Sequence, residues 1–492
     1  DTSYTNITAC DSVVWNGVTY DSSGQYTFIP EFIQIGGDID GEAEDDYSGK
    51  SVSISSDGNI VAIGAPSIWW GVGSGYVRIY QNNGGSWTQI GNDIDGEAAG
   101  DQSGWSVALN SDGGTVAIGA PGNDGNGNNA GHVRIYENIS GSWSQIGQDI
   151  DGPAADDNSG HSVSLSSDGN TVAIGVPVNG TNAAAGHVRI YQNIGGSWSQ
   201  IGGDIDGETA SDYSGYSVSL SSDGNTVAIG ATQNDGNNNN SNDARGHVRI
   251  YQNIGGYWSQ IGGDIDGEAS SDQSGFSVSL SSNGNTVAIG APYNNGNGTI
   301  SGHVRIYNYN GSSWTQIGND IDGEATDDQS GWSVSLSSDG NTVAIGAPSN
   351  AVNFGDHVRI FENIGGSWSQ IGNNIESSSA WDSFGASVSL NADGNTVVIG
   401  APANERPFGN SPTAGHVRVY NLPTLTNAGG CDSTAILNLT ITNANTSTTT
   451  IISCDSYIWN GITYTTSGSY SWSGTNMEAC DSTATLNLTI NN

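Results

Sequence analysis

The sequence predicts an all-β protein in which a seven-bladed β-propeller is inserted into the first of two small, disulfide-bonded, Ig-like β-sandwich modules. Three observations predict it: a four-strand unit that recurs seven times, a second pattern that flanks it on both sides, and a composition that opposes helices. The 492 residues include 73 glycines and one methionine, and Gly costs about 1 kcal/mol relative to Ala inside a helix. We therefore expect many short strands joined by tight turns.

The repeated unit runs SVSLSSDGNTVAIGAP, a variable loop, GHVRIYQN, GGSWSQIG and GDIDGE. Each unit has four segments of alternating apolar and polar residues, and an Asp-Gly turn such as Asp57-Gly58 joins the first two. Four antiparallel strands in repeated copies are typical of propeller blades. The first segments begin at Ser51, Ser106, Ser162, Ser217, Ser277, Ser333 and Ser387.

The ends of the repeated region predict how the ring closes. The last unit stops at HVRVY, residues 416–420, without a Trp strand, whereas an orphan FIQIG at residues 32–36 precedes the first unit. We expect this N-terminal strand to complete the last blade, which removes the open ends of the ring.

The flanking pattern is a duplication that the propeller interrupts. Residues 9–28 match residues 453–472, and residues 426–441 match residues 475–490. The predicted domains are a discontinuous module of residues 1–30 and 422–443, a propeller of residues 31–421, and a second module of residues 444–492. Because the chain opens in mid-pattern, we expect a mature fragment or an excerpt of a longer protein.

Four cysteines, each followed by Asp-Ser, allow three pairings. No Cys-x-x-Cys occurs, so zinc and thioredoxin-like chemistry at these residues are not expected. The duplication predicts a Cys454–Cys480 bridge within the second copy and a Cys10–Cys431 bridge within the first. Such structural disulfides fit an oxidising, extracellular location.

The charge balance limits the partners. Fifty acidic and ten basic residues give a net charge of −40, which excludes nucleic acid as an expected partner because phosphate binding needs Lys/Arg clusters. No apolar run approaches the roughly 20 residues of a membrane span, so membrane insertion is not expected. The acidity favours solubility in a salty medium, with divalent-cation binding as the alternative.

Two resemblances extend this interpretation. Ser-Gly before the first strand, Gly-Ala-Pro after the second and GHVRIY as the third resemble the FG-GAP repeat of integrin α-subunit propellers over residues 31–421, although the family's Asp-x-Asp-x-Asp-Gly calcium loop is replaced here by Ser-Ser-Asp-Gly-Asn. The flanking CDSxxWNGxTY and CDSTAxLNLTI patterns resemble repeats of very large secreted surface adhesins of Bacteroidota. That resemblance implies type IX secretion and a role in attachment, gliding or filament building.

One Arg and one Asp recur in each blade. Equal counts predict Arg–Asp ion pairs that connect blades, because the guanidinium offers a bidentate fork to a carboxylate. The arginines are Arg78, Arg134, Arg189, Arg249, Arg305, Arg359 and Arg418, and the aspartates are Asp46, Asp101, Asp157, Asp212, Asp272, Asp328 and Asp382.

The recurring Asp-Ile-Asp-Gly-Glu segment is the candidate cation site. Its oxygens could bind Ca²⁺, which takes six to eight oxygen ligands, and the alternative is a polar connection between blades with a Gly turn. The candidate ligands are Asp38, Asp40, Glu42, Asp93, Asp95 and Glu97. A His also begins the third strand of six blades, beginning with His132, and we expect structural hydrogen bonding rather than a metal there, because equivalent residues around a ring do not converge.

Two further positions vary between blades. The residue after Ser-Gly has the parity of the core side chains, which favours packing between blades over a ligand site at the channel mouth: Lys50, Trp105, His161, Tyr216, Phe276, Trp332 and Ala386. The loop after Gly-Ala-Pro differs most in length, and it carries Trp69, Trp70 and Arg406 as candidate ligand-binding residues, since loops on a rigid scaffold often determine specificity.

The function predicted from these observations is an extracellular adhesion or filament module of a large cell-surface protein. A lectin-like glycan-binding propeller is the alternative, and a calcium-dependent, integrin-like protein-binding propeller is the third. The expected partners are other copies or modules of the same fibre and a glycan or surface protein. No nucleophile with a paired base and no phosphate-binding loop is evident, so an enzyme is not expected.

Overall fold

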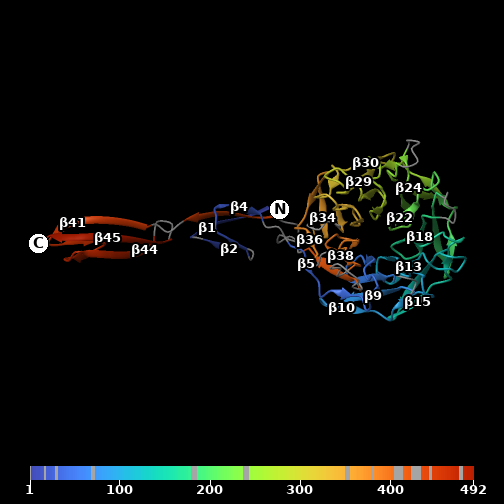
Figure 1. Cartoon of the computed structure of the whole chain (residues 1–492), viewed down its shortest axis with the longest axis horizontal. Helices are drawn as coiled ribbons and strands as arrows, with labels where there is room; N and C mark the ends of the chain where they lie inside the picture. Colours follow the sequence, from blue (N-terminus) through green and yellow to red (C-terminus); the bar gives the residue numbers. More distant parts are fainter. Residues whose placement is uncertain are drawn as a thin grey trace. The chain divides into compact units, whose positions relative to one another are not determined.

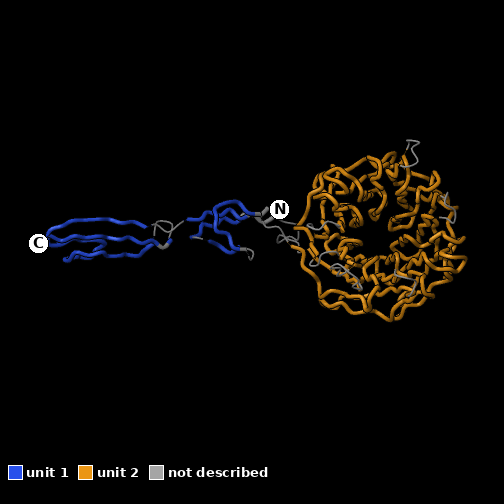
Figure 2. Tube along the Cα trace, viewed as in Figure 1, with its two compact units in different colours: residues 1–30, 424–492 blue, residues 31–423 orange. Residues whose placement is uncertain are grey.

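The computed structural model describes residues 2–10, 12–15, 18–27, 31–67, 73–178, 185–236, 243–348, 355–377, 382–403, 414–422, 434–442, 446–475 and 480–491. The chain divides into two compact units, residues 1–30 with 424–492 and residues 31–423 (Figure 2). Trp69, Trp70, Arg406 and Cys431 lie outside the described residues.

Seven sheets of one strand order lie around a ring in residues 31–423 (Figure 1). In each sheet four strands form an antiparallel path, and a short fifth strand pairs with the third. The first sheet contains β7 (Ser51–Ile54), β8 (Ile60–Ala65), β9 (Tyr76–Asn82), β10 (Trp87–Gln89) and β11 (Ile94–Asp95). The second contains β12 (Ser106–Leu109), β13 (Thr115–Ala120), β14 (His132–Ile139), β15 (Ser142–Gln145) and β16 (Ile150–Asp151). The third contains β17 (Ser162–Leu165), β18 (Thr171–Val176), β19 (His187–Ile194), β20 (Ser197–Gln200) and β21 (Ile205–Asp206).

The remaining sheets repeat this order. The fourth contains β22 (Ser214–Leu220), β23 (Thr226–Ala231), β24 (His247–Ile254), β25 (Tyr257–Gln260) and β26 (Ile265–Asp266). The fifth contains β27 (Ser277–Leu280), β28 (Thr286–Ala291), β29 (His303–Tyr309), β30 (Trp314–Gln316) and β31 (Ile321–Asp322). The sixth contains β32 (Ser333–Leu336), β33 (Thr342–Ala347), β34 (His357–Ile364), β35 (Ser367–Gln370) and β36 (Ile375–Glu376). The seventh contains β37 (Ser387–Leu390), β38 (Thr396–Ala401), β39 (His416–Asn421), β5 (Ile33–Gln34) and β6 (Ile39–Asp40).

The fifth strand is the main difference from the sequence-based expectation. The Asp-Ile-Asp segment, expected as a candidate cation site or as a polar connection between blades, pairs with the start of the third strand, as Ile94 pairs with Val77 and Asp95 with Tyr76. Its Ile side chain is buried, being 5% exposed at Ile94, so the apolar residue between two aspartates supplies the reason for pairing.

Ring closure by the N-terminal strand is confirmed. Gln34 pairs with Tyr420, and Ile39 pairs with Val417. The Ile35 amide also donates to the Val419 carbonyl at 2.8 Å. The chain therefore begins and ends the ring in one shared sheet.

The core lies between neighbouring sheets. One cluster joins Val77 and Ile79 of β9 to Val107 and Leu109 of β12, and a similar cluster of the first sheet includes Val417 of the last one. In the second strand of a sheet, such as β13, Val and Ile alternate with Ala and Gly, which fits close packing of neighbouring sheets. Each sheet thus completes its core only against the next.

The other unit contains two copies of one arrangement, each a three-stranded sheet and a two-stranded hairpin. The first sheet has the order β1 (Thr2–Cys10), β40 (Thr434–Thr442) and β4 (Gly24–Thr27), with the hairpin β2 (Val13–Trp15) and β3 (Val18–Tyr20). The second has the order β41 (Thr446–Cys454), β45 (Asp481–Asn491) and β44 (Gly468–Thr475), with the hairpin β42 (Tyr457–Trp459) and β43 (Ile462–Tyr464).

The first and last strands of each copy are parallel. In the first copy the register ends with Cys10 opposite Thr442, and in the second with Cys454 opposite Asn491. The two cysteines therefore hold the same place in their copies.

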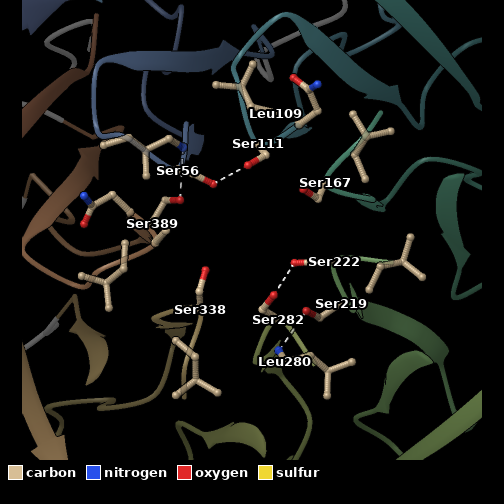
Figure 3. A pocket seen from close by; sticks show the side chains of 18 residues that line it. Ser56, Leu109, Ser111, Ser167, Ser219, Ser222, Leu280, Ser282, Ser338 and Ser389 are labelled. Atoms are coloured by element: carbon tan, nitrogen blue, oxygen red, sulfur yellow. Dashed lines mark hydrogen bonds between the residues drawn. The ribbon is translucent and has the colours of Figure 1, made fainter. Parts of the chain in front are cut away.

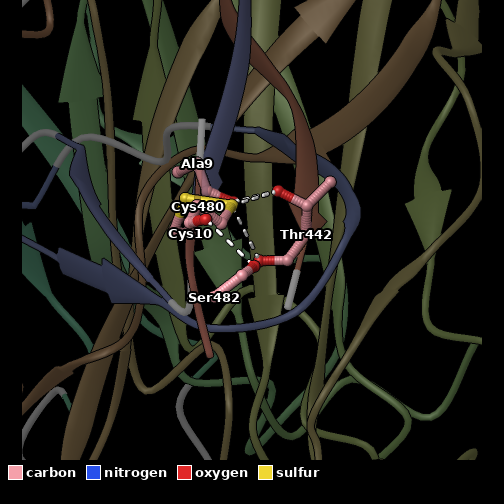
Figure 4. Close-up of a disulfide and its surroundings, with 5 residues drawn as sticks. All are labelled: Ala9, Cys10, Thr442, Cys480 and Ser482. Carbon is pink, nitrogen blue, oxygen red and sulfur yellow. Dashed lines mark hydrogen bonds between the residues drawn. A yellow bond between two sulfur atoms is a disulfide. The ribbon is translucent and has the colours of Figure 1, made fainter. Parts of the chain in front are cut away.

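The disulfide differs from the prediction. Cys10 is bonded to Cys480, with Cα atoms 5.5 Å apart (Figure 4). Cys454 is an exposed free thiol. Cys480 directly precedes β45, whereas Cys454 pairs at its far end. The 11-residue strand separates them by about 30 Å, far beyond the roughly 7 Å that a disulfide allows. The predicted Cys454–Cys480 bridge is therefore wrong, and so is the predicted Cys10–Cys431 bridge, because Cys10 is already bonded.

Candidate functional site

The recurring arginines form ion pairs, but with a different partner from the predicted one. In three sheets the guanidinium is paired with the Asp that precedes the fifth strand. Arg78 Nε and Nη2 donate to Asp93 at 2.9 and 2.8 Å. Arg189 donates to Asp204 at 3.1 Å twice, and Arg418 donates to Asp38 at 3.0 and 2.9 Å. The hydrogen bonds from Arg78 lower the pKa of Asp93.

In the other four sheets the guanidinium binds a backbone carbonyl. Arg134 Nη2 donates to the Asp95 carbonyl at 2.6 Å. The same bond, at 2.7 Å in each case, joins Arg249 to Asp206, Arg305 to Asp266 and Arg359 to Asp322. In these four sheets the arginine therefore connects two blades by binding the backbone of the preceding sheet's fifth strand.

The aspartates predicted as their partners have another role. Asp101 Oδ2 accepts the amides of Glu97 and Ala98 at 3.1 and 2.9 Å and the side chain of Asn123 at 3.1 Å. Short carboxylate side chains commonly close turns in this way. The predicted ion pairs are wrong for six of the seven arginines. Within the described residues, none of these six is ion-paired with a predicted aspartate: Arg78, Arg134, Arg189, Arg249, Arg305 and Arg359. The predicted aspartates are Asp46, Asp101, Asp157, Asp212, Asp272, Asp328 and Asp382.

The six candidate calcium ligands are distributed over separate contacts. Asp38 and Asp93 are paired with arginines, and Glu42 Oε2 lies 2.5 Å from Arg78 Nη2. Asp40 and Asp95 are exposed in their short strands, and Glu97 lies 3.9 Å from His132. Calcium binding at these residues stays a prediction.

The histidines that begin the third strands are buried. His132 is 1% exposed, and neither ring nitrogen has a hydrogen-bond partner. Burial, and next the nearby Arg134, lower the pKa of His132 to about 4. The first sheet has Tyr76 at this place, and its hydroxyl donates to Asp46 at 2.6 Å. The expected structural hydrogen bonding thus holds for the tyrosine but not for His132.

A cavity of about 250 Å³ occupies the ring centre, and leucines and eight serines line it (Figure 3). Six of these serines hold the same place in six sheets, where the seventh sheet has Ala392: Ser56, Ser111, Ser167, Ser222, Ser282 and Ser338. Backbone hydrogen bonds join these residues in a closed circuit, in which Ser56 donates to Ser111 and Ala392 donates back to Ser56 at 2.8 and 3.1 Å. Two hydroxyl pairs, Ser56 with Ser111 and Ser222 with Ser282, also lie 2.7 Å apart. The sequence pattern did not predict this circuit, although its signal was the Ser that directly precedes the Asp-Gly or Asn-Gly turn in six of the seven units.

The residues after Ser-Gly pack against one another from blade to blade. The ring centroids of Trp105, His161, Tyr216, Phe276 and Trp332 follow one another at 5.7, 4.9, 5.0 and 4.6 Å. The Lys50 ammonium lies 4.8 Å from the centre of the Trp105 ring, a favourable cation–π geometry. The favoured interpretation, packing between blades, agrees with these contacts.

One family model matches the chain. Residues 94–136 match the FG-GAP repeat, and this segment runs from β11 into β14. No curated protein matches.

Several solved structures are similar. A protein from Bacteroides uniformis named as a 6-phosphogluconolactonase has 12% identity and a TM-score of 0.47, over 67% of this chain and 85% of its own. U3-55K has 12% identity and a TM-score of 0.46, over 80% and 100%. The periplasmic gluconolactonase PpgL of Pseudomonas aeruginosa has 15% identity and a TM-score of 0.44, over 71% and 96%.

These names correct one prediction. The sequence-based prediction that the chain is not an enzyme is contradicted, because several similar structures are named as lactonases. At such identities and TM-scores the likeness assigns no activity to this chain. The prediction is withdrawn, and no activity replaces it.

The FG-GAP match and the disulfide also bear on location. Disulfides persist in oxidising compartments, so the Cys10–Cys480 bond and the FG-GAP repeat together indicate an extracellular protein. Among the described residues, no helix has the length and apolar character needed to cross a membrane. The chain is thus an all-β protein with a propeller-like ring of repeated sheets, in which residues 94–136 match the FG-GAP repeat.

Proposed function

We propose that the chain is a cell-surface adhesion module in which a seven-bladed propeller binds a protein ligand and small Ig-like modules connect it to a fibre. The observation that carries this proposal is the FG-GAP match at residues 94–136, within a sheet arrangement that recurs seven times. FG-GAP repeats form protein-binding propellers in the integrin α-subunits that the sequence resembles.

Exposed apolar side chains support a protein ligand. Four third strands end on an isoleucine that is 57 to 64% exposed, at the hairpin that leads into the fourth strand: Ile139, Ile194, Ile254 and Ile364. Single exposed apolar residues are ordinary, but equivalent ones in four sheets give the ring a repeated apolar rim. Tyr257, which is 75% exposed, pairs with Ile254 in one of these hairpins.

The disulfide supports a fibre of linked modules. The two cysteines of the second copy, Cys454 and Cys480, lie at opposite ends of β45, because β41 and β45 are parallel. Cys480 therefore bonds to Cys10 of the first copy, and this disulfide joins the two copies. Cys454 holds in the second copy the place of Cys10 in the first. We propose that its partner is the second cysteine of a further module of the same type.

An attachment assay tests the adhesion proposal. Beads coated with the 492-residue chain should attach to a surface that carries the protein ligand. A variant with the four rim isoleucines changed to Ser should attach several-fold less: Ile139, Ile194, Ile254 and Ile364. Treating the surface with protease should abolish attachment, whereas periodate oxidation of its glycans should not. Loss of attachment only after periodate would replace the protein ligand by a glycan, and attachment that the four substitutions leave unchanged would contradict the role of the rim.

Covalent multimer formation tests the fibre proposal. In a glutathione redox buffer, two thiols transfer two electrons and two protons to glutathione disulfide and form one protein disulfide. Non-reducing electrophoresis should then show linked copies of the chain, and Cys454→Ser should remove them. Chains that stay monomeric, or multimers that persist in the Cys454→Ser variant, would contradict the head-to-tail linkage.

A further inference from the structure

Within the described part of the chain, three clusters, called triads here, bring together one Glu, one His and one Asp. One ligand atom from each residue of a triad lies within 4.8 Å of the other two. The triads are Glu97–His132–Asp149, Glu208–His247–Asp264 and Glu268–His303–Asp320. They belong to the second, fourth and fifth sheets.

The fold assembles each triad from three segments. The Glu comes from the link that enters the sheet, the His begins the third strand, and the Asp directly precedes the fifth strand. Since His132 of β14 pairs with Asp151 of β16, the strand register brings Asp149 near the imidazole. Sequence reasoning compared the histidines only with one another and missed the carboxylates that each one meets.

The histidines of the triads are buried, since His132, His247 and His303 are each 1% exposed. Neither ring nitrogen of His132 has a hydrogen-bond partner, and its Nδ1 lies 3.9 Å from Glu97 Oε2. In the third triad, His303 Nδ1 lies 3.7 Å from Asp320 Oδ2. A neutral imidazole nitrogen is a common metal ligand.

In two sheets without a triad the arginine takes the Asp that a triad would use. Where Tyr76 replaces the His or Pro153 replaces the Glu, the guanidinium is paired with the Asp, as in Arg78–Asp93 and Arg189–Asp204. In all three triad sheets it binds a backbone carbonyl instead, as Arg359 does in the sixth sheet. The Asp of each triad is therefore not paired with that arginine, and Arg134 Nη1 lies 3.8 Å from Glu97.

Each Asp of a triad is oriented by a glutamine four residues earlier. Gln145 Nε2 donates to Asp149 Oδ1 at 2.6 Å, and Gln260 and Gln316 make the same bond at 2.7 Å to Asp264 and Asp320. Such a bond orients a carboxylate ligand and leaves its second oxygen for a metal. The Glu side chains are 44 to 49% exposed, so they are free to move toward a bound ion.

We propose that each triad binds one divalent transition-metal ion of the zinc type, three ions per chain. One imidazole nitrogen and two carboxylate oxygens suit Zn²⁺, which takes N and O ligands at about 2.0–2.2 Å and accepts water in a fourth position. Ca²⁺ instead needs six to eight oxygens and does not favour imidazole. The ion would hold the segment that connects two sheets, which carries the Glu, against the start of the third strand, which carries the His.

Metal content tests the proposal. The 492-residue chain carrying Cys454→Ser, which removes the free thiol as a competing ligand, is stripped with chelator, incubated with Zn²⁺ and desalted. Elemental analysis should find three Zn²⁺ per chain, and Zn²⁺ should raise the melting temperature. The variant Glu97→Gln, Glu208→Gln, Glu268→Gln should bind Zn²⁺ at least about tenfold more weakly, since even loss of an outer-shell partner costs about 10–100-fold.

Matched variants distinguish Zn²⁺ binding by the triads from non-specific Zn²⁺ binding by other acidic side chains. Glu42 and Glu324 hold the same place in sheets without a triad, where Tyr76 replaces the His and Asn374 the Asp. Changing both to Gln should leave three Zn²⁺ per chain. Replacing His132, His247 and His303 by Tyr, the residue that the first sheet has naturally, should abolish binding. Fewer than one Zn²⁺ per chain, equal binding by the triple Gln variant, or displacement of Zn²⁺ by millimolar Ca²⁺ would overturn the proposal.

Discussion

Gln34 of β5 and Tyr420 of β39 are register partners, so the first strand of the ring is part of its last sheet. Closure therefore rests on pairing between the two ends of the repeated region. It also rests on the apolar contacts that β6 adds, because Ile39 is 7% exposed and packs in a cluster with Val52 and Val417.

Ile39→Ala should destabilise the ring by about 2–4 kcal/mol, the range for truncating a buried isoleucine. Ile33→Ala is the matched control, because Ile33 lies in β5 and is 61% exposed, and it should change the unfolding free energy by less than about 0.5 kcal/mol. Urea unfolding followed by Trp fluorescence measures both. Equal effects of the two substitutions would contradict the described closure.

Gly230→Ala should destabilise the protein by about 2–3 kcal/mol, because a side chain forced into a packed site strains its neighbours. A Cβ at Gly230 of β23 would overlap the Gly275 carbonyl oxygen and the Ser217 hydroxyl. Gly263→Ala is the control, since nothing lies within 4 Å of a Cβ built there. Thermal unfolding compares the two, and a Gly230→Ala protein as stable as the control would contradict the close approach of adjacent sheets.

Peptide mapping should find a Cys10–Cys480 bond in the oxidised protein. In the native state, a maleimide should label Cys454, which is exposed, and should label Cys10 and Cys480 only after reduction. A linked peptide containing Cys454 and Cys480 of one chain would contradict the parallel register of β41 and β45.

Asp356→Asn should make the protein more stable at pH 8 and have little effect near pH 4. Asp356 and Asp382 are 2% and 0% exposed. Burial, and next the Asp382 carboxylate, raise the pKa of Asp356 from 3.8 to about 8. The folded state holds a proton that the unfolded state has lost, so this group makes the protein less stable as pH rises from about 4 to about 8.

The measurement is the unfolding free energy as a function of pH. The unfolding free energy of the Asp356→Asn variant should decline less as pH rises, because an amide does not titrate. Glu137→Gln removes one exposed carboxylate and should keep that decline. Parallel curves for the Asp356→Asn and unmodified proteins would show that the carboxyl group is ionised in the folded state.

Much of the ring could be predicted from the sequence. Val-x-Ile alternation and Asp-Gly turns specified the four-strand units, because these features act through neighbours in the chain. The orphan segment at residues 32–36 specified the closure, because the last unit lacks the strand that this segment matches. The fifth strand was missed, since two residues such as Ile94–Asp95 are too short to show a period.

The candidate site was only partly predictable. The repeats identified the Arg, His, Asp and Glu positions, yet the pairing of Arg78 with Asp93 rather than Asp46 depends on which side chains the strand register places at hydrogen-bond distance. The same holds for His132, which meets Glu97 and Asp149 through pairing of β14 with β16.

Amino-acid order alone specifies the repeated strands, their turns and the duplication of the flanking modules, since periodicity and turn chemistry are local properties. The disulfide partners and the carboxylates that face each Arg and His depend instead on how the folded chain brings distant segments together. Cys454 and Cys480 belong to one sequence copy, but the parallel pairing of β41 with β45 holds them at opposite ends of a strand. Contacts of this kind depend on distances between chain segments, and the order of residues along the chain does not specify those distances.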